Sequence, residues 1–249
     1  MENKENKIRF GLIGKDIDYS FSRAYFTQKF KDLELPNYSY ENFDFQDINE
    51  LSEVLKKNTN INGFNITIPY KEEVFPFLAF IDEKAKAIGA VNTIKFTKDG
   101  LKGYNTDYYG FQKSIEPFIQ PHHKKALILG TGGASKAIAF VFKALGIEYT
   151  FVSRRKKEGQ FTYEELNQQL MEDYTVLVNC TPVGTFPAIH EKPALPYEFI
   201  TTKHLLFDLI YNPEKTAFLL AGEAQGAQIK NGDKMLELQA EKAWEIWNS

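Results

Sequence analysis

Asn65, Thr67 and Lys71 bring an amide, a hydroxyl and an amino group into one short stretch, residues 63–71. These are the donors and acceptors that bind a polyhydroxylated or carboxylated small molecule. Leaving such groups buried without partners costs about 1–3 kcal/mol each, so their grouping favours a ligand site. The competing interpretation is a polar edge strand with a solvated lysine.

The alternation of this stretch predicts a short β-strand over residues 65–68. Asn65 and Thr67 would lie on one face, and Ile66 and Ile68 on the other. Pro69 lacks a backbone donor and would end the strand. The polar groups would then emerge at the carboxyl end of a strand, where open α/β sheets bind their ligands.

A glycine-rich turn lies between a continuously apolar run, residues 125–130, and an amphipathic pattern over residues 134–145. Glycines let the backbone approach a pyrophosphate, and a helix N-terminus supplies free N–H groups. Strand, turn, helix and next strand fit within about 30 residues, as a βαβ unit requires. The turn therefore predicts a dinucleotide site that contains Gly130, Thr131, Gly132, Gly133 and Ala134.

The end of the next strand distinguishes the two nicotinamide nucleotides. An NAD site usually carries an acidic residue there, which bonds the ribose 2′-hydroxyl. This chain has Ser153, followed by Arg154, Arg155 and two lysines. Guanidinium groups suit a 2′-phosphate through charge-assisted hydrogen bonds, so the sequence predicts NADP(H) as the cofactor.

Asp107 follows a predicted hairpin, where the first half of the chain passes into the second. An aspartate paired with Lys71 could exchange a proton with a substrate hydroxyl while a nicotinamide takes the hydride. Asp107 could also cap the helix that begins beside it, and the two roles are compatible.

Strand and helix patterns alternate along the chain, which predicts parallel sheets with crossover helices. Strands are expected at residues 8–14, 38–43, 65–68, 91–96, 101–105, 125–130, 149–152, 176–179 and 205–209, and helices at 22–33, 47–57, 82–88, 108–116, 134–145 and 234–247.

The predicted fold is α/β with two domains. Residues 1–105 with 230–249 would form a mostly parallel substrate-binding and catalytic domain, and residues 106–229 a Rossmann-type, doubly wound NADP-binding domain. Gln239 interrupts the apolar stripe of the C-terminal helix, either as a satisfied core amide or as a ligand contact, and a ligand contact would require this helix to return to the first domain.

The composition is that of an ordinary globular protein, with 43% hydrophobic and 25% charged residues. A net charge of -3 gives no support for nucleic-acid binding. No apolar run approaches the roughly 20 residues that span a bilayer. The first seven residues are polar, and Cys180 is the single cysteine, so we expect a cytoplasmic protein. The four histidines lack metal-ligand spacing, and no metal is predicted.

The chain resembles the shikimate dehydrogenase family, whose members reduce 3-dehydroshikimate to shikimate with NADPH. The similarity follows the whole chain in order, through residues 11–14, 20–22, 63–71, 89–93, 105–107, 130–135, 179–184, 207–213, 231–232 and 235–240. This resemblance implies an NADP-dependent oxidoreductase of aromatic amino acid and chorismate biosynthesis. The partner would be a small-molecule substrate, and the choice between monomer and homodimer stays open.

The resemblance also implies roles for single residues. Lys71 and Asp107 would be the catalytic pair, with Lys71 carrying the proton. The substrate carboxylate would bind Ser20 and Ser22. Ring hydroxyls would contact Asn65, Thr67, Asn92, Asp107 and Gln239, and Tyr211 would close the site from the nucleotide side. The cofactor would contact the glycine turn, Ser153, Arg154, Arg155, Thr181 and Gly232.

The chain departs from the family pattern around the two serines, where histidine and prolines are common and residues 18–23 contain neither; Tyr19 and Arg23 could tune the affinity or geometry of the carboxylate pocket. Thr131 replaces the usual alanine of the glycine turn. Two alternatives remain: a quinate/shikimate dehydrogenase, and a non-catalytic NADP-binding module. The basic run after Ser153 disfavours the NAD use expected of the first, and retention of Lys71 with Asp107 disfavours the second.

Overall fold

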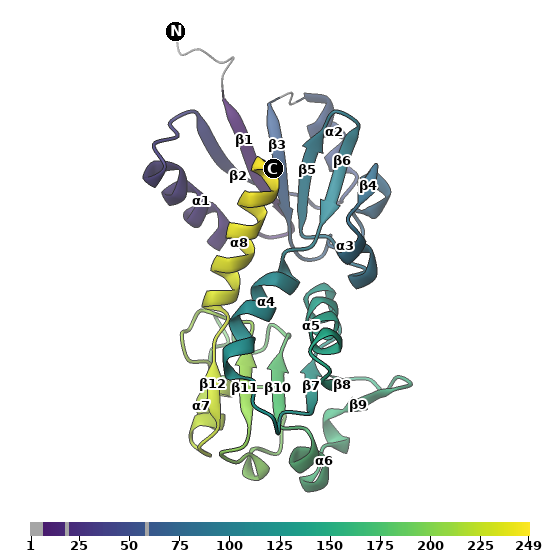
Figure 1. The fold of residues 1–249 in the computed structure, drawn as a ribbon, viewed down its shortest axis with the longest axis vertical. Coiled ribbons are helices and arrows are strands. Elements are labelled where there is room, and N and C mark those ends of the chain that lie inside the picture. The colour runs from purple at the N-terminus through teal and green to yellow at the C-terminus, as the bar shows by residue number, and fades with distance from the viewer. Residues whose placement is uncertain (1–6, 18–19, 58–59) are drawn as a thin grey trace. The chain divides into compact units, whose positions relative to one another are not determined.

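The computed structural model describes residues 7–17, 20–57 and 60–249. The chain divides into two compact units, which are described separately (Figure 1). Unit 1 comprises Met1–Thr106 with Ala240–Ser249, and unit 2 comprises Asp107–Gln239. Each unit contains a six-stranded sheet, so the predicted two-domain α/β fold class is confirmed.

Unit 1 has a mixed sheet with strand order β2-β1-β3-β5-β6-β4. Strands β1, β2 and β3 are parallel, whereas β5 runs antiparallel to both of its neighbours. The elements are β1 (Ile8–Gly14), α1 (Phe21–Asp32), β2 (Tyr38–Asp44), α2 (Glu50–Lys57), β3 (Ile61–Ile66), β4 (Phe80–Ile81), α3 (Glu83–Ile88), β5 (Thr93–Thr97) and β6 (Gly100–Tyr104), with a 3₁₀ turn at Phe75–Phe77.

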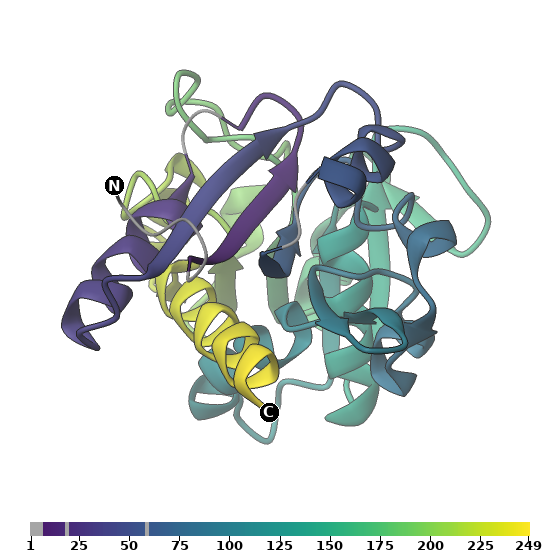
Figure 2. The ribbon, with the colours of Figure 1, turned by 90° about the horizontal axis from the view of Figure 1, so that it is seen from above.

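Two hydrophobic layers stabilise the unit 1 sheet. On one face, Phe26 and Phe30 of α1 pack with Trp247, which lies near the end of the C-terminal helix α8 (Asp233–Asn248), over Phe10 and Tyr40. Figure 2 shows α1 and α8 on the same side of β1 and β2. The other face carries a separate cluster that includes side chains from α2 and β3. The predicted return of the C-terminal helix to the first part of the chain is therefore observed.

Strand β3 ends at Ile66, two residues earlier than the sequence predicts. The chain then turns, because Tyr70 N–H donates to the Thr67 carbonyl across 3.0 Å. The prediction that Ile66 and Ile68 lie on one face of the same strand is wrong, since Ile68 lies beyond the end of β3 and is 72% exposed while Ile66 is buried. Local alternation cannot reveal this turn, which removes Ile68 from the strand.

Unit 2 has an all-parallel sheet with strand order β12-β11-β10-β7-β8-β9. Numbered along the chain, this is the 3-2-1-4-5-6 order of the Rossmann fold. The elements are α4 (Asp107–Ile115), β7 (Lys125–Leu129), α5 (Gly133–Ala144), β8 (Glu148–Ser153), β9 (Gln160–Thr162), α6 (Gln168–Asp173), β10 (Val176–Asn179), β11 (Leu205–Asp208), α7 (Ala217–Glu223), β12 (Gln228–Lys230) and the start of α8, with 3₁₀ turns at Glu116–Phe118, Tyr163–Glu165 and Tyr197–Phe199.

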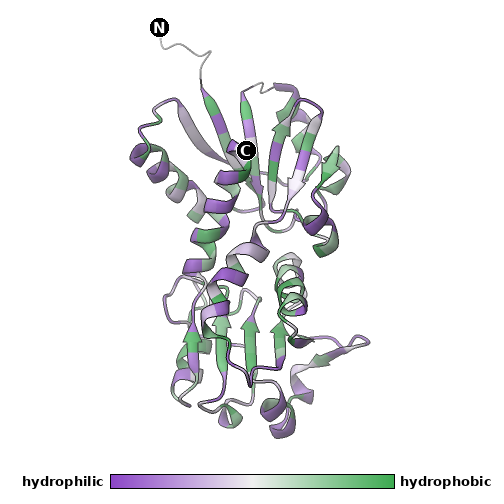
Figure 3. Ribbon diagram, viewed as in Figure 1, coloured by the Kyte–Doolittle hydropathy of each residue, from purple (hydrophilic) through white to green (hydrophobic). Residues whose placement is uncertain are grey.

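The central strands of unit 2 are hydrophobic along their length, as Figure 3 shows for β7, β10 and β11. Their side chains are buried on both faces, which is the pattern of a parallel sheet covered by helices. In the part of the chain that the structure describes, no helix is long and apolar enough to cross a membrane.

Candidate functional site

A buried polar network joins the end of β3 to the start of β5. The Asn65 side-chain amide donates to the Thr93 hydroxyl (3.2 Å) and to the Asn92 carbonyl (3.3 Å). The Asn92 side-chain oxygen accepts from the backbone N–H of Thr106 (2.6 Å). Asn65 and Asn92, which the sequence predicts as substrate contacts, therefore lie side by side.

Tyr40 extends this network towards α1. Its hydroxyl donates to Asn65 Oδ1 across 2.8 Å, and the Ser22 hydroxyl forms a hydrogen bond to the phenol oxygen. Burial raises the pKa of Tyr40 well above its usual range, so the phenol stays neutral. Sequence reasoning missed Tyr40, because an aromatic residue at an alternating position of a strand is indistinguishable from ordinary core.

Ser20 caps the N-terminus of α1. It adopts extended backbone angles, and its hydroxyl accepts the backbone N–H of Arg23 across 3.3 Å. Ser22 lies in the first turn of the same helix, while the Arg23 side chain is exposed. Tyr19, where the chain departs from the family pattern, lies outside the described residues.

The turn after β3 holds the backbones of Thr67 and Lys71. Thr67 N–H donates to the Ile13 carbonyl (2.9 Å), and the Lys71 carbonyl accepts from Val91 N–H (2.8 Å). Since Val91 precedes Asn92, the segment that carries Lys71 is fixed beside the segment that carries Asn92. Unit 1 thus brings together the segments of five predicted substrate or catalytic residues: Ser22, Asn65, Thr67, Lys71 and Asn92.

Asp107 and Gln239 belong to unit 2, and both are buried. Asp107 is the first residue of α4. The helix containing Gln239 packs closely on α4, because a Cβ added to Gly110 would lie 2.5 Å from the Met235 carbonyl and 3.2 Å from Gln239 Cβ. The pairing of Asp107 with Lys71, and the contact of Gln239 with the substrate, stay predictions because the two units are described separately.

The glycine turn of unit 2 has the geometry of a phosphate site. Gly130 has φ +100°, and Gly132 is the N-cap of α5 without a side-chain cap. The N-terminal N–H groups of this helix are therefore open to an anion. The Ser135 hydroxyl donates to the Gly132 carbonyl across 2.7 Å and fixes the turn. Thr131 is exposed and Ala134 half-buried at the same end of α5.

The loop after β8 presents two guanidinium groups to solvent. Arg154 and Arg155 are exposed, and neither side chain forms a hydrogen bond or an ion pair with another described residue. The Ser153 hydroxyl donates to the Arg155 carbonyl across 2.5 Å, which shapes the loop. Lys156, by contrast, is paired with Glu165 at 2.5 Å.

Parallel pairing places the ends of β7, β8, β10 and β11 along one edge of the sheet. Gly130 and Thr181 are neighbours there, because a Cβ on Gly130 would lie 3.0 Å from Thr181 Cγ2. Gly232 packs against the loop that carries Tyr211, since a Cβ added at position 232 would lie 2.1 Å from the Leu209 carbonyl oxygen. The predicted cofactor residues are thus gathered at one edge.

The described residues offer neither a reactive cysteine nor a metal site. Burial raises the pKa of the Cys180 thiol well above its usual range, which is the opposite of what a nucleophilic cysteine requires. Among the described residues, no group of three or more histidine, cysteine, aspartate or glutamate side chains could hold a metal ion.

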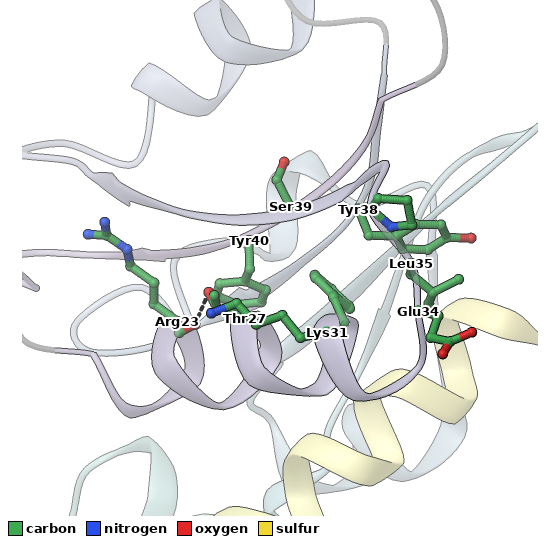
Figure 4. Close-up of a pocket in the computed structure, with 10 residues that line it drawn as sticks. Arg23, Thr27, Lys31, Glu34, Leu35, Tyr38, Ser39 and Tyr40 are labelled. Atoms are coloured by element: carbon green, nitrogen blue, oxygen red, sulfur yellow. Dashed lines mark hydrogen bonds between the residues drawn. The ribbon is translucent and has the colours of Figure 1, made fainter.

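A cavity of about 540 Å³ lies between α1 and β2 in unit 1 (Figure 4). Figure 4 shows Arg23 at one end and Glu34 at the other. None of the predicted substrate, catalytic or cofactor residues lines this cavity, but Tyr40 of the polar network forms part of its wall.

Known proteins resemble the chain over nearly its full length. Residues 12–94 match the model of the shikimate dehydrogenase substrate binding domain. An NADP(+) shikimate dehydrogenase of Methanosphaera stadtmanae is 37% identical over 257 residues, covering 95% of this chain and 90% of the relative.

Solved structures agree with this family match. Shikimate dehydrogenase from Aquifex aeolicus superimposes with a TM-score of 0.87 at 30% identity, covering 100% of this chain and 94% of the other. Shikimate 5-dehydrogenase from Thermus thermophilus, in complex with NADP(H) and shikimate, gives a TM-score of 0.84 at 30% identity, covering 96% and 93%.

Proposed function

Since the chain belongs to the shikimate dehydrogenase family and is an NADP-dependent dehydrogenase of shikimate, we propose that it works as the reductase of 3-dehydroshikimate. NADPH would deliver a hydride to the substrate carbonyl carbon, and a side chain would deliver a proton to the carbonyl oxygen. The product would be shikimate, and the enzyme would then act in chorismate and aromatic amino acid biosynthesis.

The two units would divide the work. The residues that match the substrate-binding domain model, 12–94, all fall in unit 1. The glycine turn and the exposed arginines fall in unit 2. We therefore assign substrate binding to unit 1 and NADP binding to unit 2, with Asp107, Tyr211 and Gln239 reaching the substrate from unit 2.

The observation that carries the substrate assignment is the chain of hydrogen bonds from Ser22 through Tyr40 to Asn65. Ser20 and Ser22 would bind the carboxylate, and Asn65, Thr67 and Asn92 the ring hydroxyls. A carboxylate and hydroxyls on opposite sides of one small ring require binding groups a few ångströms apart on a rigid support, and the network provides this within unit 1.

Lys71 would donate the proton to the carbonyl oxygen during reduction and accept it back in the reverse direction. Asp107 would hold the Lys71 ammonium and a substrate hydroxyl in position. An ammonium group beside the developing alkoxide also stabilises its negative charge.

NADP(H) would lie along the edge of the unit 2 sheet. The pyrophosphate would bind the N-terminus of α5 through the backbone of residues 130–134, and the 2′-phosphate would bind Arg154 and Arg155 beyond Ser153. Because β8 lies on one side of β7 and β10 on the other, the nicotinamide half would extend towards Thr181, Tyr211 and Gly232.

The decisive experiment is to incubate purified protein with shikimate and NADP+ and to follow NADPH formation by absorbance. We expect turnover that is lost when Lys71 is replaced by alanine. Quinate with NAD+ serves as the second arm. Faster turnover in that arm would identify a quinate/shikimate dehydrogenase, and no turnover in either arm would leave the non-catalytic NADP-binding module.

A further inference from the structure

Asp208 is a fully buried carboxylate at the end of β11 that accepts three hydrogen bonds. Its Oδ1 atom accepts from Asn179 Nδ2 (3.0 Å) and from the backbone N–H of Ile210 (3.1 Å). Its Oδ2 atom accepts from the Thr216 hydroxyl (2.6 Å). Sequence reasoning assigned no role to Asp208, Asn179 or Thr216.

Asn179 connects this carboxylate to the loop after β10. Its side-chain oxygen accepts from both the backbone N–H (3.0 Å) and the hydroxyl (2.6 Å) of Thr181, and its amide also donates to the Val183 carbonyl (3.3 Å). The Asn179 amide can hold this orientation because Asp208 accepts from it. The position of Thr181 thus depends on Asp208 through one intermediate side chain.

The same carboxylate organises the loop after β11. The Ile210 N–H bond and the Thr216 bond fasten both ends of the segment that carries Tyr211. The Ile210 carbonyl in turn accepts from Gly232 N–H across 3.1 Å. Asp208 therefore joins the segments of Thr181, Tyr211 and Gly232, the three residues proposed at the nicotinamide half.

No lysine, arginine or histidine among the described residues forms an ion pair with Asp208. The titratable groups that interact with it electrostatically are the Cys180 thiol and the Tyr197 phenol, and Tyr163 interacts with Tyr197 in turn. Burial raises the pKa of Asp208 to about 6, although its three donors oppose the shift. A buried carboxylate without a cation is costly, so we expect Asp208 to fill a role that a neutral side chain would not fill.

We propose that Asp208 is a positioning residue, whose ionised carboxylate holds the loops of residues 180–184 and 209–216 in the arrangement that receives the nicotinamide half of NADP(H). The inference rests on the proposed placement of the nicotinamide beside Thr181. The ionised form is required because it accepts all three donors at once, whereas a protonated carboxyl would turn a donor towards Thr216.

Asp208→Asn preserves the shape and can keep both bonds to Oδ1, but it removes the charge and the acceptor that faces Thr216. Binding of NADPH and of adenosine 2′,5′-bisphosphate, which lacks the nicotinamide half, is measured by titration calorimetry. We expect roughly five- to tenfold weaker NADPH binding, as for the loss of one hydrogen bond or somewhat more, with unchanged binding of the bisphosphate.

Two changes at Thr216 provide matched controls. Thr216→Val removes the hydroxyl at nearly constant volume and should also weaken the binding of NADPH but not of the bisphosphate. Thr216→Ser keeps the hydroxyl and should bind NADPH like the wild type. These variants keep the proposal testable if Asp208→Asn does not fold.

A pH series adds a readout that a merely structural role would not change. As the pH falls through about 6, Asp208 becomes protonated. The NADPH affinity of the wild type should therefore fall more steeply than that of Asp208→Asn. The 2′-phosphate of NADPH titrates in the same range, but it does so with both proteins, so the difference isolates Asp208.

The proposal would be overturned if Asp208→Asn weakened the binding of NADPH and of the bisphosphate equally, or left NADPH affinity unchanged. It would also be overturned if the NADPH affinities of the wild type and Asp208→Asn changed with pH in parallel. These binding outcomes do not depend on turnover. A protein that binds as expected but does not oxidise shikimate would contradict the proposed function and leave the role of Asp208 intact.

Discussion

The Tyr40 hydroxyl, a single oxygen atom, allows the proposed substrate site to be tested. Tyr40→Phe removes the hydroxyl that bonds Asn65 and accepts from Ser22. We expect the KM for shikimate to rise roughly tenfold, as for about 1.4 kcal/mol of lost binding, with the KM for NADP+ unchanged. Steady-state kinetics at saturating cosubstrate measure both constants.

Tyr70→Phe is the matched control for Tyr40→Phe. Tyr70 is also buried, and its hydroxyl donates to the Phe45 carbonyl across 2.7 Å. Both variants should lose about 1 kcal/mol of stability, but Tyr70→Phe should keep its KM for shikimate. Similar KM values for the two variants would mean that Tyr40 is ordinary core.

His204 makes the stability of unit 2 depend on pH. The ring is buried, with Nδ1 3.0 Å from Thr201 N and Nε2 2.9 Å from the Met171 carbonyl oxygen. Burial lowers its pKa below the usual value of 6.5. The unfolded chain then binds a proton at a higher pH than the folded chain, so stability is lost as the pH falls below about 6.5.

His204→Gln keeps a donor and an acceptor but does not titrate in this range. Thermal melting between pH 7.5 and 5 should therefore show a smaller loss of melting temperature for this variant than for the wild type. Asp208, whose raised pKa acts with the opposite sign, is present in both proteins and cancels. Equal losses would show that protonation of His204 does not limit acid stability.

At the scale of elements, the loop after β8 should select the nucleotide. Replacing Arg154 and Arg155 by glutamine should weaken NADP binding by about two to four orders of magnitude, since each charge-assisted contact contributes about 1.5–3 kcal/mol. NAD binding should change little. Lys156→Gln is the control, because that ammonium is already paired with Glu165. Equal losses for both nucleotides would exclude recognition of the 2′-phosphate by these arginines.

The contact between α4 and α8 depends on Gly110. Helix propensity alone predicts that Gly110→Ala stabilises α4 by about 1 kcal/mol. The added Cβ would lie 2.5 Å from the Met235 carbonyl oxygen, so we expect a net loss of about 1–3 kcal/mol instead. The sign of the change in chemical denaturation decides between the two effects, and a gain in stability would contradict the tight packing.

At the scale of the whole molecule, the proposed catalytic pair draws one residue from each unit. Lys71→Ala should lower kcat by about 10²–10⁴-fold, with a smaller effect on the KM for shikimate. Asp107→Asn should lower kcat similarly and raise KM more, because it would also lose a ring hydroxyl. The losses should not add in the double variant if the two groups act as one unit.

Stopped-flow measurement of hydride transfer in the four proteins of this cycle isolates the chemical step from product release. Fully additive losses would show that Lys71 and Asp107 act independently. Near-normal turnover of Lys71→Ala across the pH range would refute its role as the proton carrier.

Several features of this protein follow from the sequence alone because local rules determine them. Asp82 and Gly89 mark the two ends of α3, as N-cap and left-handed C-cap, and the glycine turn lies between β7 and α5 where a βαβ unit requires it. The two-domain α/β class, the family and NADP use were also predicted and are confirmed, since the ordered motifs extend over most of the chain. The roles of single site residues remain predictions.

The tertiary structure decided what depends on distant partners. Strands β4, β9 and β12 have at most three residues, and their pairing with neighbours makes them strands where the local pattern is too short. Tyr40 and Asn65 are separated by 25 positions, and Asn179 and Asp208 by 29. A hydrogen bond between such residues leaves no periodic signal in the sequence, because its energy depends on the geometry that the folded sheet imposes.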